Sequence, residues 1–140
     1  MGYYRRGTAI VETKKGILLT AGKNGIFMLP GGKARRGESR KKAAIRELRE
    51  ETGLIAQSCK YLFTYKGSRA FHKVFLIKAK GYIRPRKEIR YIAYWRPGSS
   101  LRLSKSTAKI IERYYQLKNK KDIKKKIKKF IKNWFNFRFV

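Results

Sequence analysis

The segment from Ser39 to Gly53 constrains the fold most, because it predicts a helix whose two ends are both marked. Ser39 is a favoured N-cap residue, and Gly53 is a favoured residue just past the last turn. Between them, Ala44, Ile45 and Leu48 fall on one side at helical spacing. We therefore predict a helix that packs this apolar side against a core.

Acidic residues gather on the same helix in a chain that otherwise avoids them. The 140 residues include 38 Lys and Arg against 8 Asp and Glu, a formal net charge of +30. Glu47, Glu50 and Glu51 are spaced i, i+3 and i+4, so their carboxylates share one face and repel one another. A hard divalent cation such as Mg²⁺ or Mn²⁺ would reverse that repulsion, because such ions prefer oxygen ligands. The alternative is a solvated acidic face that pairs with neighbouring arginines and lysines.

The residues around these acids favour the metal site. Gly32 is followed after five residues by Glu38, and after seven more by the run Arg46-Glu47-Leu48-Arg49-Glu50-Glu51-Thr52-Gly53-Leu54. This segment resembles the Nudix box, G-x5-E-x7-R-E-U-x-E-E-x-G-U with U aliphatic, at every specified position. The approach Leu29-Pro30-Gly31-Gly32 and the later Glu88-Ile89 with Trp95 also look like this family. The resemblance covers roughly residues 7–117.

The resemblance implies a fold, an activity and a set of metal ligands. The fold is an α/β/α sandwich around a mixed β-sheet, and the activity is Mg²⁺- or Mn²⁺-dependent hydrolysis of a phosphoanhydride bond next to a nucleoside diphosphate. By position, Glu50 and Glu51 would bind metal, and Glu47 would bind metal or act as the base that prepares the attacking water. The carbonyl of Gly31 would add a further ligand.

Three more residues receive roles from the same resemblance. Glu38 would support the metal site through water or by pairing with Arg46, which would orient the carboxylates. Glu88 falls where many family members carry one further catalytic or metal-binding acid. The other interpretation of Glu88 is a surface residue flanked by Lys87 and Arg90.

The remaining elements agree with an α/β architecture. Two β-prone runs, 8–11 and 17–20, are separated by Lys14-Lys15-Gly16 and suit a hairpin, and a short apolar strand over 26–29 is stopped by a tight loop at Pro30-Gly31-Gly32. Further strands are predicted over 59–65, 73–79 and 90–95, and a second helix over 104–117. The lone His72 and the aromatic side chains of the strands are interpreted as structural.

Residues 118–140 differ in character from the rest. They hold nine lysines and Arg138 against one acid, Asp122. Their apolar residues recur at helical spacing and predict an amphipathic basic helix with the stripe Ile123, Ile127, Phe130, Ile131, Trp134 and Phe135. Three roles stay open for it: docking on the domain, lying on an anionic membrane, or binding RNA. We therefore divide the chain into a Nudix domain, 1–117, and a helical extension, 118–140.

The composition limits the binding partners and the cellular compartment that we expect. The positive charge attracts polyanions without choosing among them. A single cysteine, Cys59, without a metal-ligand partner indicates a reducing compartment, and with no signal or membrane-spanning pattern we expect a cytoplasmic protein. A nucleoside triphosphate, in ordinary or oxidised form, is the expected substrate. The alternatives are the 5′ end of an RNA, or a Nudix-fold module that binds nucleic acid without turnover. A homodimer is compatible with the family.

Overall fold

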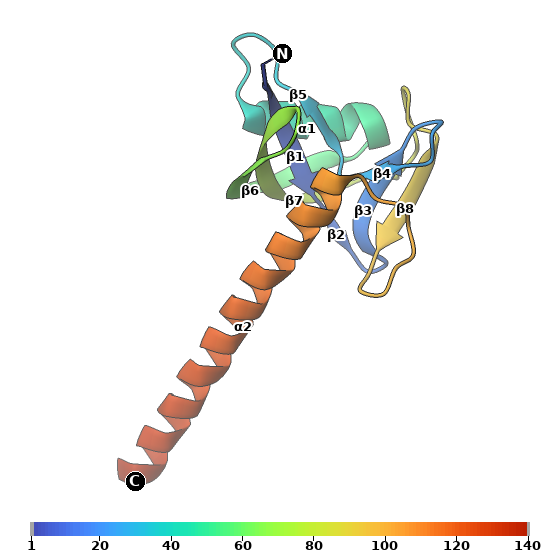
Figure 1. Ribbon diagram of the computed structural model, residues 1–140. Helices are drawn as coiled ribbons and strands as arrows, with labels where there is room; N and C mark the ends of the chain where they lie inside the picture. The colour runs from blue at the N-terminus through green and yellow to red at the C-terminus, as the bar shows by residue number, and fades with distance from the viewer. Residues whose placement is uncertain (1, 140) are drawn as a thin grey trace. The chain divides into compact units, whose positions relative to one another are not determined.

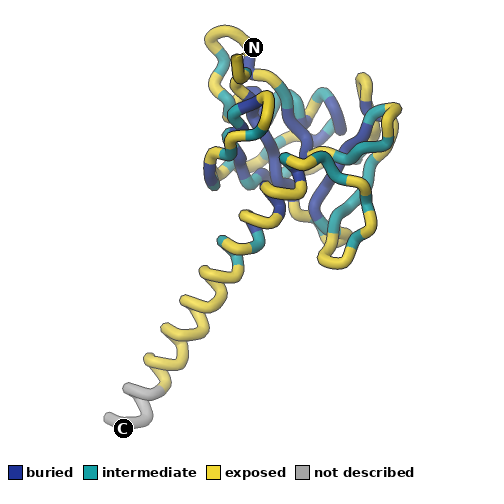
Figure 2. Tube along the Cα trace, in the orientation of Figure 1, coloured by how far each residue is buried: buried dark blue, intermediate teal, exposed yellow. Residues whose placement is uncertain are grey.

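The computed structural model describes the backbone of residues 2–139 and the side chains of residues 2–133 (Figure 1). The chain forms two compact units, residues 1–107 and 108–140, which are described separately. The first unit holds two β-sheets and the helix α1, Arg40–Thr52, with buried residues concentrated where these elements meet (Figure 2). The mixed sheet and helices of an α/β fold, predicted from the sequence, are confirmed.

Four strands in the order β5-β1-β7-β6 form the mixed sheet. Their bounds are Tyr4–Ile10 for β1, Gly31–Lys33 for β5, Ile55–Lys66 for β6 and Ala70–Lys80 for β7. Strand β1 is central: it runs parallel to β7 and antiparallel to β5. We predicted a loop at Gly31 and Gly32, and this was wrong, because both residues pair with β1 in register, Gly31 opposite Thr8. The strand form brings them alongside the centre of the sheet.

The second sheet is small and antiparallel. It orders β2-β3-β4, with β8 on β3, and the bounds are Glu12–Thr13, Gly16–Ala21, Phe27–Met28 and Tyr91–Trp95 for β2, β3, β4 and β8. The predicted turn at Lys14-Lys15-Gly16 is present, but the strand it joins to β3 is the two-residue β2. The run 8–11 belongs mainly to β1 in the other sheet. Turn chemistry is local, whereas strand partners are decided by long-range burial, which explains the difference.

Helix α1 ends where its sequence predicts. The Ser39 side chain accepts a hydrogen bond from the Lys42 N–H at 3.1 Å, and Gly53 closes the helix in a left-handed conformation, φ 81°. Ala44 and Leu48 are fully buried in a core with Ala9 of β1 and Phe75 of β7. Strand β1 passes so close beneath α1 that a side chain at Gly7 would meet the backbone of Arg40 and Ala44. The acid-bearing side of α1 is thereby held at the edge formed by β5.

The second unit is made by most of the helix α2, Lys105–Phe139. We predicted a helix over 104–117 and a separate one beyond it, but α2 is continuous, because the sequence between them has no glycine or proline to stop it. The side chains of Ile123, Ile127, Phe130 and Ile131 are exposed, and those of Trp134 and Phe135 lie outside the described residues. Within the described part of the chain, no helix is both apolar and long enough to pass through a bilayer.

Candidate active site

The two glycines of β5 lie directly against the acidic face of α1. The backbone N–H of Gly31 donates a hydrogen bond of 2.9 Å to Glu51 Oε1. A Cβ on Gly32 would stand 2.5 Å from Cδ of Glu47, so only a glycine leaves room for that carboxylate. Gly31 itself has φ 152°, which favours glycine. The glycine pair and the helix acids, 15 or more residues apart in sequence, therefore form one structural unit.

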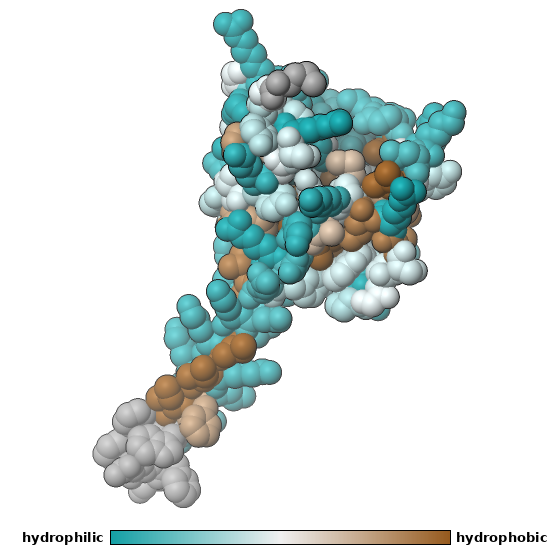
Figure 3. Space-filling view, in the orientation of Figure 1, coloured by the Kyte–Doolittle hydropathy of each residue, from teal (hydrophilic) through white to brown (hydrophobic). Residues whose placement is uncertain are grey.

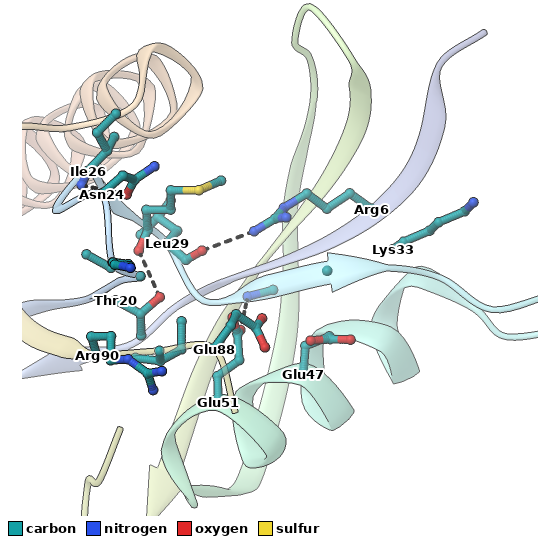
Figure 4. A pocket seen from close by; sticks show the side chains of 17 residues that line it. Arg6, Thr20, Asn24, Ile26, Leu29, Lys33, Glu47, Glu51, Glu88 and Arg90 are labelled. Carbon is teal, nitrogen blue, oxygen red and sulfur yellow. Dashed lines mark hydrogen bonds between the residues drawn. The ribbon is translucent and has the colours of Figure 1, made fainter. Parts of the chain in front are cut away.

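This unit forms one wall of a cavity of about 760 Å³. Three carboxylates line it: Glu47 and Glu51 from α1, and Glu88 from the segment between β7 and β8. Figure 4 shows Glu88 next to Glu51, with Glu47 one turn along the helix. Basic side chains complete the lining, namely those of Arg6, Lys23, Lys33 and Arg90. A concave site with both acids and cations suits a phosphorylated ligand with a bound cation.

Glu51 is the most perturbed acid of the cavity. Only 6% of it is exposed, and burial raises the pKa of its carboxyl to about 7, against the opposing effects of the Gly31 N–H and the Arg6 guanidinium. Glu47 and Glu88 add to the rise because they are negative charges nearby. A divalent cation would stabilise the charged form of a buried carboxylate that has other carboxylates nearby. The oxygen donors present therefore fit a hard metal ion.

Arg46 holds three of the predicted site residues together. Its guanidinium donates to both carboxylate oxygens of Glu38, at 2.8 Å and 2.9 Å, to Glu47 Oε1 at 2.7 Å, and to Glu50 Oε2 at 3.1 Å. It also reaches the carbonyl of Lys33 at 3.2 Å. The bond from Arg46 is the main reason that the pKa of Glu38 falls to about 2. Arg46 thus ties α1 to the loop before it and fixes the direction of the Glu47 carboxylate.

Glu50 occupies a different position from the other two helix acids. Its Oε2 accepts a hydrogen bond from Lys87 Nζ at 2.6 Å, and it lines a second hollow beside Arg46 and Arg49. The side chain of Glu50 does not line the main cavity with Glu47 and Glu51. Among the residues whose side chains are described, no three His, Cys, Asp or Glu are gathered as a ready metal cluster. Glu50 would have to exchange Lys87 for a metal ion to join the others.

Lys87 itself is held in an unusual conformation. It is the one described residue other than glycine with a positive φ, 54°. Such a conformation costs free energy for a lysine and persists only when the surroundings favour it. The structure shows one ion pair for the Lys87 side chain, the short contact with Glu50.

Arg6 was missed by reasoning from the sequence. It is only 8% exposed, donates to the Leu29 carbonyl at 3.2 Å and to Thr8 Oγ1 at 3.3 Å, and faces the cavity. Figure 4 shows the bond to Leu29 that holds the guanidinium beside β5. Lys23, Asn24 and Arg90 were missed as well. In a chain with 38 basic residues a single arginine carries no signal, and Arg6 stands beside a second arginine, Arg5, in β1.

His72 does not line the main cavity. It is buried, its Nδ1 lies 2.8 Å from Thr8 Oγ1, and burial lowers the pKa of the imidazole to about 4, with a further contribution from Arg6. The ring is therefore neutral at physiological pH. It anchors Thr8 and, through Thr8, the Arg6 side chain, which agrees with the structural interpretation of this residue.

Comparison with known proteins identifies the family. A family model described as the NUDIX domain matches residues 4–132, so the chain belongs to the Nudix family. A Nudix hydrolase family member from Chromobacterium violaceum is 44% identical, with a TM-score of 0.78 over 84% of this chain and 79% of that one. A MutT NUDIX hydrolase from Burkholderia pseudomallei, 21% identical, has a TM-score of 0.72 over 80% and 98% of the two chains, which bears on the fold alone.

A curated relative adds a partial match. An ADP-ribose pyrophosphatase from Methanocaldococcus jannaschii is 43% identical over 60 residues, which make up 40% of this chain and 36% of that protein. The match thus spans about a third of the relative's length. The family model therefore places this chain in the Nudix family, and the pyrophosphatase activity is that of the relative. Nudix enzymes generally use divalent metal ions.

Proposed function

We propose that this chain hydrolyses, with Mg²⁺, a phosphoanhydride bond in a nucleoside diphosphate linked to another moiety. The observation that carries the proposal is the lining of one cavity by Glu47, Glu51 and Glu88 together with four basic side chains. The acids supply oxygen ligands for a cation, and the bases supply contacts for phosphate oxygens that the cation does not reach. Neither set alone would hold a diphosphate and its counter-ion.

Each residue of the site takes a part in this proposal. Glu47, Glu51 and the Gly31 carbonyl would hold the ion, and Glu50 would join them once it leaves Lys87. When bound, Mg²⁺ would neutralise the diphosphate charge and lower the pKa of a water aligned for attack at phosphorus. Glu47 and Glu88 are the candidates to accept the proton of that water, because both line the cavity.

Arg46 and Glu38 act outside the cavity as positioning residues. The forked contact between them leaves one guanidinium nitrogen, Nη1, to hold both Glu47 and Glu50. Because the distance and direction of a carboxylate decide how well it can ligate an ion, this arrangement preorganises the acids before substrate arrives.

A nucleoside triphosphate is the substrate type we favour. Four basic side chains line the cavity, and a triphosphate carries more negative charge than a nucleotide sugar. ADP-ribose is a second candidate, because of the 43% identity to the Methanocaldococcus jannaschii protein over 60 residues. The 5′-triphosphate of an RNA is a third, for which the net charge of +30 would provide backbone contacts.

The test is a substrate panel with product analysis. Nucleoside triphosphates, 8-oxo-dGTP, ADP-ribose, dinucleoside polyphosphates and triphosphorylated RNA would each be incubated with Mg²⁺, with Mn²⁺ and with EDTA. We expect metal-dependent release of pyrophosphate or a nucleoside monophosphate, and its loss in Glu51→Gln. Inactivity of the folded protein on every compound, with tight salt-sensitive RNA binding, would instead support a binding module.

A further inference from the structure

The second half of α2 presents an apolar stripe that the rest of its own unit leaves exposed. Ile123, Ile127, Phe130 and Ile131 follow one another at i, i+4, i+7 and i+8, and they are 55%, 52%, 72% and 46% exposed. Figure 3 shows these residues as a brown band along the helix, with hydrophilic residues beside it. Four large apolar side chains in one line are more than scattered surface hydrophobics, which occur singly.

This stripe is a face of its own and does not continue the buried face at the start of the helix. Ile110, Ile111 and Tyr114 are 1%, 2% and 4% exposed. From Tyr114 to Ile123 the chain advances nine residues, which is about two and a half turns at 3.6 residues per turn. The two apolar sets therefore point to opposite sides of α2. Whatever buries the first set cannot cover the second by extending along the helix.

Lysines surround the stripe. Between residues 118 and 133 there are nine lysines and a single acid, Asp122. By helical geometry Lys124 and Lys126 flank the stripe, while Lys125, Lys129 and Lys132 lie on the far side. Flanking lysines can keep their ammonium groups at the level of lipid phosphates while their methylene chains cover apolar surface.

We propose that residues 118–133 of α2 dock on the surface of an anionic phospholipid bilayer, with the Ile/Phe stripe among the acyl chains and the lysines at the headgroups. An anionic bilayer matches both features of this segment. Its interior accepts the apolar stripe, and its headgroups supply dense negative charge for the lysines. RNA would contact the lysines but leave the stripe in water. Pairing with a second copy would cover the stripe but bring the lysines of the two copies close together. These lysines would repel one another, because each copy has only one acid in this segment. The proposal is independent of the substrate.

Vesicle co-sedimentation of the full chain tests it. Vesicles of phosphatidylcholine alone are compared with vesicles that also contain phosphatidylglycerol, over a series of salt concentrations. We expect sedimentation with the anionic vesicles only. Ile127→Gln/Phe130→Gln removes apolar area without changing charge, and we expect it to weaken vesicle binding by about tenfold or more, since each buried methylene contributes. Lys124→Gln/Lys126→Gln, at the two lysines that flank the stripe, should weaken binding too, most at low salt.

The matched control is Ile55→Gln/Tyr82→Gln, which removes one isoleucine and one aromatic ring that are also exposed but lie outside α2. It should bind vesicles as the wild type does. Circular dichroism establishes that each variant keeps its helix. Equal vesicle binding by Ile127→Gln/Phe130→Gln and the wild type would overturn the proposal, because the general positive charge would then suffice. Loss of self-association or of RNA binding in that variant, with vesicle binding unchanged, would overturn it in favour of those partners.

Discussion

The backbone N–H of Gly31 donates a 2.9 Å hydrogen bond to the carboxylate of Glu51, across twenty residues of sequence. The bond fixes a buried acid of α1 against the glycine strand β5 in one wall of the cavity. Because burial outweighs this bond, the pKa of Glu51 still rises to about 7. The pair therefore holds a carboxylate in place before any cation is present to stabilise it.

The first prediction concerns Glu51 and activity. Glu51→Gln keeps an oxygen that can accept from Gly31 but removes the negative charge. We expect metal-dependent hydrolysis to fall by about a hundredfold or more, because the proposed metal ligand is lost, while the melting temperature at pH 8 stays equal or rises. Steady-state kinetics and calorimetry measure both. Glu112→Gln, an exposed glutamate of α2, is the control, and activity of Glu51→Gln near that of the wild type would remove Glu51 from the site.

The second prediction concerns pH and stability without metal. The folded-state pKa of Glu51, about 7, is above the unfolded value near 4.5, so the folded protein holds this proton more tightly. The stabilisation is complete below pH 4.5 and is lost as pH rises through 7, an effect on the order of 3 kcal/mol. The lowered pKa of His72 acts in the opposite direction below pH 6.5. The free energy of unfolding of the wild type minus that of Glu51→Gln, in EDTA, isolates the Glu51 effect, and a difference independent of pH would contradict it.

The third prediction concerns Arg46. Arg46→Lys keeps the charge but cannot make the forked bond to Glu38 while also holding Glu47 and Glu50. We expect kcat to fall more than KM changes, because the carboxylates lose their direction, and stability to fall by roughly 1–3 kcal/mol. The matched control is Arg49→Lys on the same helix, for which we expect a much smaller effect. Equal effects of the two substitutions would mean that Arg46 only adds charge.

The fourth prediction concerns the contact that keeps Glu50 from the other acids. Lys87→Asn removes the ammonium that lies 2.6 Å from Glu50 and suits the positive φ of 54° better than lysine does. We expect half-maximal activity at a lower Mg²⁺ concentration and an unchanged or higher melting temperature. Lys60→Asn, on an exposed position of β6, serves as the comparison. A higher Mg²⁺ requirement in Lys87→Asn would show that the lysine helps the site.

The fifth prediction separates two glycines of adjacent strands. A Cβ at Gly32 would meet the end of the flexible Glu47 side chain, whereas a Cβ at Gly7 would meet the backbone of α1, 2.6 Å from the Ala44 nitrogen. Gly32→Ala should therefore lose activity with little loss of stability. Gly7→Ala should lose about 1–3 kcal/mol of stability, because backbone cannot move aside as a side chain can. Chemical denaturation and kinetics on both variants test the contrast, and a reversed order would contradict the placement of β5 against α1.

The local elements of the site could be predicted from the sequence alone. Ser39 and Gly53 mark the ends of α1 because capping depends on neighbours within one turn, and the spacing of Arg46, Glu47 and Glu51 places them on that helix. The spacing of the glycines, the acids and Arg46 also indicated the family, because a metal site of this kind requires these residue types at these positions. The end of the second helix was misplaced for an equally local reason: amphipathic character changes after residue 117, but the sequence contains no residue that stops a helix there.

What only the tertiary structure decided is which distant residues share the cavity. Arg6 of β1 joins Glu47 and Glu51 because β1 pairs with β5 beneath α1. Glu88 joins them because its loop is held to the end of α1, where the Arg86 N–H donates to the Glu51 carbonyl. Glu50, three residues from Glu47, instead contacts Lys87. Helix caps and helical spacing are short-range features, because they depend on residues that are close in sequence. Strand register, burial and the choice of ion partner depend on packing across the whole chain, so no local pattern specifies them.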